Sequence, residues 1–157
     1  MDAEALRSLA RLVTNERIGT LGTLRAGAPN VSMVAYLPDP GFAAFWLRLS
    51  RLAWHTQDLA QDPRVALSIC ETDDRRADPQ TLARVTIRGE ASMLAVDEPE
   101  SIRLRQLWLE RFPASAVTFE LADFSFWRLA PRDARFVAGF ARTHNLSAAQ
   151  LARAGSA

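Results

Sequence analysis

The residues best suited to hold an anion lie between positions 50 and 56. Ser50 is a residue type favoured at helix N-caps. The backbone N–H groups of a helix that begins there attract an anion, and Arg51 would add a guanidinium fork. At 100° per residue, His55 and Thr56 flank the leucine side of such a helix. We therefore expect a phosphate site made of Ser50, Arg51, His55 and Thr56. The alternative is a capped helix with an interior histidine bonded to a carbonyl.

A second segment that could hold a ligand is the apolar stretch 31–36. Its alternation places Ser32 and Val34 on one face of a strand and Met33 on the other. Small side chains and backbone amides would let a flat heterocycle approach the strand closely. An ordinary barrel strand has the same pattern, so the alternation alone leaves both interpretations open.

Aromatic residues and arginines alternate in a third segment, over 124–129 and 135–142. Such side chains stack on flat rings or clamp anions. A barrel wall or a dimer interface has the same composition. The two histidines, the single cysteine and the scattered acids show no metal-ligand spacing, so no metal site is expected. His144 is expected at the surface, where it could serve as a single axial haem ligand.

The composition excludes several kinds of chemistry. All 19 basic residues are arginines, which rules out a lysine Schiff base and the lysine of a phosphate-binding P-loop. Eighteen acids leave a net charge of +1, which argues against nucleic-acid binding. Cys70 is the only cysteine, so the chain has no internal disulfide; it is expected in a strand interior.

The predicted elements describe one mainly β domain over residues 1–157 with inserted helices. Helices are predicted at 3–14, 52–61 and 99–112, with a capped stub at 147–154. The apolar residues of 99–112 lie most of the way round, so we expect this helix to be covered on more than one side. Strands are predicted at 18–24, 30–37, 42–49, 65–70, 84–93, 124–129 and 134–140, the last two joined by a turn at 131–133. This order predicts a six- to seven-stranded antiparallel split β-barrel.

Nothing in the sequence predicts export or membrane insertion. The first residues carry acids, unlike a secretory signal, and the longest apolar run, 42–47, is too short to cross a bilayer. We therefore expect a soluble cytoplasmic protein.

The order and spacing of these segments resemble the pyridoxamine 5′-phosphate oxidase-like FMN-binding split-barrel superfamily, and within it the haem-utilisation branch. The resemblance runs over about residues 8–150. It rests on VSMVAY at 31–36, LSRLAWHT at 49–56, DPRVAL at 62–67, ARVTIRGEA at 83–91, FWRL at 126–129 and ARFVAGF at 134–140.

The resemblance implies a homodimer with two FMN sites at its interface. The strand matching Ser32, Met33 and Val34 would run along the flavin ring, and the segment 50–56 would hold the phosphate. Arg84, Trp127 and Arg135 match positions on or near the site that the partner subunit often contributes, and Trp127 would help to close it. No catalytic residue is assigned.

This sequence departs from the oxidase pattern at two lysines: His55 stands near the first and Leu37 near the second. The oxidase's pyridoxal-binding pattern is also missing, so oxidation of vitamin B6 is not predicted. Since the phosphate would depend partly on His55, we expect FMN binding to weaken as the pH rises through the titration of His55.

The function expected from this resemblance is an FMN-dependent oxidoreductase of an unidentified small substrate. The alternatives are a haem-binding protein, which rests on the branch and on His144, and a cofactor-free interaction module. Longer members of the haem-utilisation branch carry a further domain after the barrel, and this sequence ends at Ala157, so FMN is the main expectation.

Overall fold

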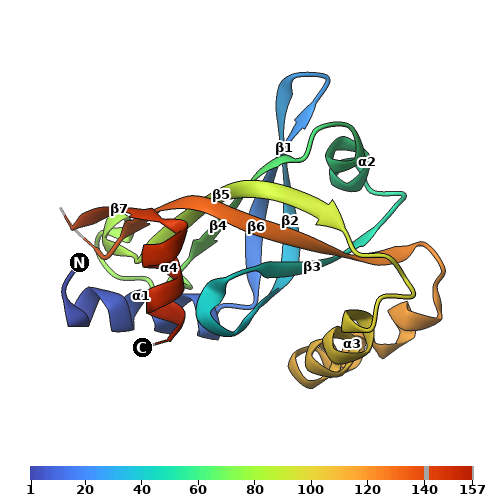
Figure 1. The fold of residues 1–157 in the computed structure, drawn as a ribbon. Coiled ribbons are helices and arrows are strands. Elements are labelled where there is room, and N and C mark those ends of the chain that lie inside the picture. Colours follow the sequence, from blue (N-terminus) through green and yellow to red (C-terminus); the bar gives the residue numbers. More distant parts are fainter. Residues whose placement is uncertain (140–141, 157) are drawn as a thin grey trace.

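Seven antiparallel strands dominate this computed structural model, which describes residues 1–139 and 142–156. Strands β1 to β6 close into a barrel through the pairing of β3 with β6, and β7 extends the sheet beyond β6. The expected split-barrel architecture is confirmed (Figure 1). The strands are β1 (Ile18–Arg25), β2 (Ala28–Pro38), β3 (Phe45–Ser50), β4 (Arg64–Cys70), β5 (Arg84–Met93), β6 (Phe124–Val137) and β7 (Thr143–Ser147).

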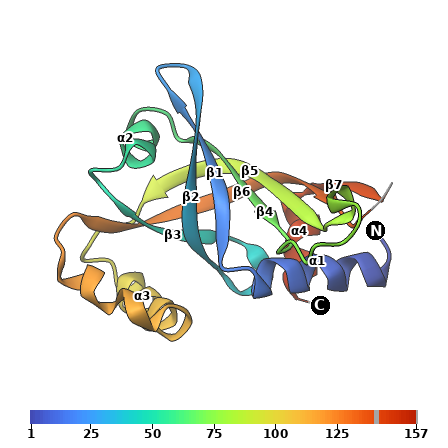
Figure 2. The same cartoon turned by 180° about the vertical axis from the view of Figure 1, so that it is seen from behind.

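Among the described residues, four α-helices lie around the outside of this barrel. They are α1 (Ala3–Asn15), α2 (Trp54–Gln61), α3 (Glu100–Arg111) and α4 (Ala148–Gly155), with short 3₁₀ segments at Pro40–Phe42, Pro79–Thr81 and Pro113–Glu120. Figure 2 shows α2 beside the projecting β1–β2 hairpin, far from α1 and α4, which lie together near both chain ends. In the part of the chain that the structure describes, no helix is long and apolar enough to cross a membrane.

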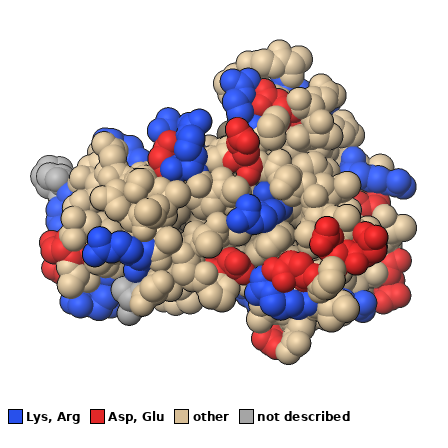
Figure 3. Space-filling view, in the orientation of Figure 1, with Lys and Arg blue, Asp and Glu red and all other residues tan. Residues whose placement is uncertain are grey.

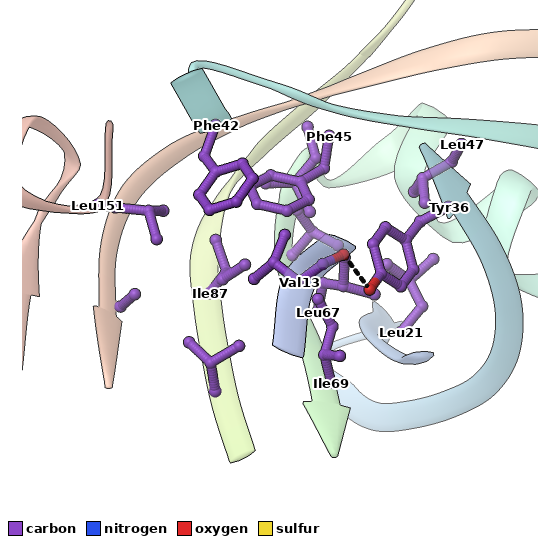
Figure 4. Close-up of a cluster of buried hydrophobic side chains, with 14 of the residues drawn as sticks. Val13, Leu21, Tyr36, Phe42, Phe45, Leu47, Leu67, Ile69, Ile87 and Leu151 are labelled. Atoms are coloured by element: carbon purple, nitrogen blue, oxygen red, sulfur yellow. Dashed lines mark hydrogen bonds between the residues drawn. The ribbon is translucent and has the colours of Figure 1, made fainter. Parts of the chain in front are cut away.

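The interior of the barrel is filled by the inward side of each strand. Leu21, Leu47, Leu67 and Ile87 are fully buried there, as strand alternation predicts. Tyr36 is also fully buried, and its hydroxyl donates a 2.8 Å hydrogen bond to the carbonyl of Val13 (Figure 4). This bond satisfies the buried phenol and ties α1 to the barrel.

Residues 124–137 form one long strand, which corrects the predicted hairpin. β6 pairs first with β3 and then with β7, while β5 runs along nearly its whole length, so Pro131 lies inside a strand and not in a turn. The register shifts between Arg88 and Gly89, opposite this proline. Proline has no N–H to donate to the neighbouring strand, and the bulge allows the strand to continue without that hydrogen bond. The sequence Pro-Arg-Asp is typical of turns, so it predicts a turn at this position. Strand β7 was not predicted, and Phe140 and Ala141 lie outside the described residues.

The predicted helices differ from the helices of the structure mainly at their ends and in their burial. The N-terminal helix is confirmed, and Ser147 and Gln150 form the predicted capping box of α4. Helix α3 buries a single stripe, Leu104 and Trp108, against the outer face of the barrel, and Ile102 is exposed, so the expectation of cover on several sides is wrong. Cys70 ends β4 at an exposed position, not in a strand interior, because β4 reaches the barrel rim there.

Candidate functional site

An open apolar groove of about 530 Å³ lies between β2, β3 and α2. It brings together four of the predicted site residues: Met33, Val34, Ser50 and His55. Ala35, Leu49, Ala53, Phe112 and Phe124 complete the apolar walls, and Arg17, Ile18 and Arg48 also line the groove. Ser32 precedes these wall residues on β2 and is half-buried. The volume of the groove lies within the range of small-molecule binding pockets, and its lining is mostly carbon surface.

Helix α2 begins later than the sequence predicts, and this changes the expected phosphate site. Its N-cap is Ala53, which makes no side-chain capping bond, and its first residue is Trp54. Residues 51–53 form a turn between β3 and α2. Ser50 is therefore the last residue of β3 and not a helix cap, because its pairing with Phe124 keeps it in the sheet.

Asp123 occupies the hydrogen-bonding groups that were expected to receive a phosphate. The Ser50 hydroxyl donates to the Asp123 carboxylate, and the Arg51 backbone N–H donates to the Asp123 carbonyl at 2.8 Å. Arg51 is exposed and Thr56 is buried, so neither lines the groove. A carboxylate next to Ser50 would repel a phosphate.

His55 is the imidazole of the groove, placed on the first turn of α2. Burial lowers the pKa of His55 below its usual value, and the Asp58 carboxylate offsets this only in part. A histidine with a lowered pKa is neutral at pH 7, and neutral imidazole is the form that binds a metal. His55 is therefore better suited to ligate a metal ion than to supply positive charge to a phosphate.

Two arginines supply positive charge at the groove. Arg48 donates from Nη2 to the carbonyl of Thr118 at 2.8 Å, and its guanidinium lies 3.7 Å from the ring centroid of Phe119. Arg17 lies 5.0 Å from the ring centroid of Phe112. Neither arginine forms an ion pair among the described residues, so both remain available to an anionic group.

Asp58, which no sequence pattern distinguishes, is buried one turn after His55 on the same helix. Its carboxylate accepts hydrogen bonds from Thr23, Arg25 and Asn30 at 2.8, 2.9 and 3.0 Å. An aspartate three residues after a groove histidine was the only available signal, and surface helices carry such residues routinely.

Arg84 and Arg135 lie in a separate hollow of about 400 Å³, which Gln80, Thr86, Val137, Gly139 and Thr143 also line. Figure 1 shows its elements, the start of β5 and β7, at the opposite end of the barrel from α2. Trp127 lies in the barrel core and is 5% exposed, so it lines neither of these two hollows.

His144, the second histidine, is not at the surface as expected. It is half-buried on β7, stacked on the ring of Phe136, and its Nε2 is buried without a hydrogen bond from the described residues. It lines a third hollow near the N-terminus.

Among residues 1–139 and 142–156, no three histidine, cysteine or acidic side chains gather into a metal-ion site. Figure 3 shows arginines and acids interspersed over one face.

A family model described as pyridoxamine 5′-phosphate oxidase matches residues 6–138. The chain is 32% identical over 124 residues to the non-canonical haem oxygenase HOZ of Arabidopsis thaliana, covering 79% of this chain and 36% of that protein. It is 25% identical over 133 residues to the haem oxygenase HutZ of Vibrio cholerae, covering 80% of this chain and 70% of HutZ. The chain thus spans about a third of the plant relative.

A solved structure described as a haem-binding protein from Mycobacterium smegmatis superposes with a TM-score of 0.84 at 30% identity. The superposition covers 98% of this chain and 62% of the mycobacterial one. All three of these relatives carry haem in their names.

Proposed function

Because the chain belongs to the pyridoxamine 5′-phosphate oxidase family, as the sequence resemblance predicted, and matches relatives of its haem-utilisation branch, we propose that it binds haem in the groove between β2, β3 and α2. A haem-binding protein was the alternative expected from the sequence, and it replaces the FMN-dependent oxidoreductase as the proposed function. One observation carries it: the groove combines apolar walls with the imidazole of His55, while Asp123 occupies the place expected for a phosphate.

The residues of the groove fit the chemical parts of haem. Met33, Val34 and Leu49 offer carbon surface to the porphyrin ring, and Arg17 and Arg48 offer positive charge to the two propionates. His55, neutral near pH 7, would hold the iron. When bound, haem would supply redox-active iron, while the protein binds and orients it and keeps water from one of its faces.

A competing assignment to FMN needs a phosphate site, and the described residues supply only part of one. Ser50 and the amide of Arg51 are already engaged by Asp123. His55 brings little positive charge at neutral pH because burial lowers its pKa. The apolar walls of the groove would suit a flavin ring as well as a porphyrin, so the phosphate is the part that separates the two cofactors.

Haem titration of the purified protein tests this proposal through its visible spectrum. We expect a sharp Soret band with saturable binding, and we expect His55→Ala to change the band and lower the affinity at least about tenfold. His144→Ala is the matched control, since His144 lies outside the groove, and should bind as the wild type does. No saturable haem binding, or loss of the ligated spectrum in His144→Ala alone, would overturn the assignment.

FMN titration under the same conditions separates the two cofactors. We expect FMN to bind weakly and to be displaced by haem, because both rings would use the same apolar walls. Tight FMN binding that haem fails to displace would instead support the flavoprotein interpretation.

A further inference from the structure

Asp58 is one of three buried polar or charged side chains in the described part of the molecule, with Thr23 and Thr56, and it is the only one of them that carries a formal charge. Its side chain is 3% exposed. A buried carboxylate costs several kcal/mol of desolvation, roughly, unless hydrogen bonds replace the lost water. Here three side chains replace it: Thr23, Arg25 and Asn30. These hydrogen bonds offset the cost of burial and keep the pKa of the Asp58 carboxyl below its usual value.

All three partners of Asp58 belong to the β1–β2 hairpin. Thr23 and Arg25 lie at the C-terminal end of β1, and Asn30 on β2 pairs with Thr23 across the hairpin. Asp58 itself lies on α2. The same hairpin continues along β2 to Met33 and Val34, so the network links the strand wall of the groove to the helix that carries His55.

Helix α2 is short and buries only three side chains, Thr56, Asp58 and Leu59. It is only eight residues long and lacks a side-chain N-cap, so it is not stable by itself. Leu59 anchors one side of it in the core. On the other side, the Arg25 guanidinium lies 4.3 Å from the ring centroid of the exposed Trp54 while it pairs with Asp58. Asp58 and Arg25 therefore supply polar contacts that link α2 to the hairpin.

We propose that Asp58 is a positioning residue that sets the separation of the two groove walls, and with it the place of His55 relative to β2. The inference rests on the proposed function for its consequence, since the groove is where haem is proposed to bind. The contacts between Asp58 and the hairpin do not depend on a ligand. The haem assignment and the positioning role of Asp58 can therefore be tested independently.

The first test measures the wall separation in the haem-free protein. Spin labels at Val31→Cys and Gln57→Cys, both exposed positions, report the distance between hairpin and helix in a Cys70→Ser background. We expect a single narrow distance distribution in the parent and a broad or shifted one in Asp58→Ala. An unchanged distribution in Asp58→Ala would overturn the proposal.

The matched control is Asp62→Ala. Asp62 lies at the other end of α2 and bonds to Arg64, its own near neighbour in sequence, so its loss should leave the distance distribution unchanged. Should Asp58→Ala fail to fold, Arg25→Ala removes only one of the three bonds, together with the contact to Trp54, and should broaden the distribution less.

The second test is haem titration of the same variants. We expect Asp58→Ala to weaken binding at least about tenfold and to shift the Soret band at saturating haem, since His55 would no longer be held at one position. Asp62→Ala should match the wild type in both respects. Weak binding with a normal band would mean that Asp58 acts through stability alone and would overturn the positioning role.

The combined outcomes separate the two proposals. If the parent binds no haem but Asp58→Ala broadens the label distances, the haem assignment fails and the positioning of the walls stands. If the parent binds haem and Asp58→Ala leaves both distance and spectrum unchanged, the positioning proposal fails and the haem assignment stands.

Discussion

His55 and Asp58 show that burial changes what a residue type means. In the sequence, His55 is expected to supply positive charge to a phosphate. In the folded chain, burial lowers its pKa, so it is a neutral imidazole near pH 7. Asp58, an ordinary helix residue in the sequence, becomes a buried carboxylate with three partners. The sequence thus predicts residues that the fold brings together in one groove, but not the protonation state of their groups.

Acid stability should depend measurably on Asp58. Burial raises the pKa of Asp58, but hydrogen bonds from Thr23, Asn30 and Arg25 outweigh burial and leave the pKa below its usual value. A lowered pKa in the folded state adds stability above the unfolded pKa of about 3.9, and this stability is lost as the pH falls through the folded value.

Urea unfolding of the wild type and of Asp58→Asn at pH 7 and at pH 3 measures that contribution. The difference in unfolding free energy between the two proteins should be about 3 kcal/mol at pH 7 and should shrink at pH 3. The other acids are common to both proteins and cancel in the difference. A difference that stays constant with pH would contradict the assignment of a charged, paired Asp58.

At the scale of elements, the long strand β6 determines the shape of the barrel. It closes the barrel through β3 at one end and carries β7 at the other. Pro131 in its middle is accommodated by the register shift at Gly89 on β5. A Cβ at Gly89 would lie 2.0 Å from the carbonyl oxygen of Ala130, so only glycine allows this close approach.

Replacing this glycine should destabilise the whole barrel. Gly89→Ala is expected to lower the unfolding free energy by about 3 kcal/mol, because the backbones of β5 and β6 must separate. Gly22→Ala is the control: its Cβ would meet the carbonyl oxygen of Ala66 at 3.6 Å, an ordinary contact. Thermal melting of both variants compares the two costs. Equal melting temperatures would show that the bulge tolerates a side chain.

At the scale of the whole molecule, the predicted site residues separate into two groups. Met33, Val34, Ser50 and His55 line the groove beside α2, whereas Arg84 and Arg135 line the hollow beside β7, at the other end of the barrel (Figure 1). One copy therefore does not bring both groups to one ligand. If all of them act on one haem, two copies must meet, which is the homodimer proposed from the family resemblance.

Mixing two defective variants tests this shared site. His55→Ala changes the groove and Arg135→Ala the other hollow, so with a shared site each pure variant should bind haem poorly. Subunit exchange at equal amounts should give half mixed dimers, each with one intact site, so about a quarter of all sites should recover. Sedimentation would confirm the dimers. If haem binding does not recover although mixed dimers have formed, each complete site lies within one copy.

The sequence by itself determined the architecture and the family of this protein. Strand alternation, helix periodicity and the Ser147 capping box are local signals, and they predicted the barrel, α1 and α4. Motif order identified the family and the segments 31–36 and 50–56. These features survive folding because they depend on residues that are near one another in the chain.

Only the tertiary structure decided the chemical surroundings of the residues at the proposed site. Asp123 reaches Ser50 from a distant part of the chain, and three hairpin residues reach Asp58 across the fold. The continuity of β6 through Pro131 depends on Gly89 of another strand. Desolvation, charge pairing and close backbone approach depend on residues that are neighbours in space but distant in the chain. The local sequence around each residue therefore does not predict them.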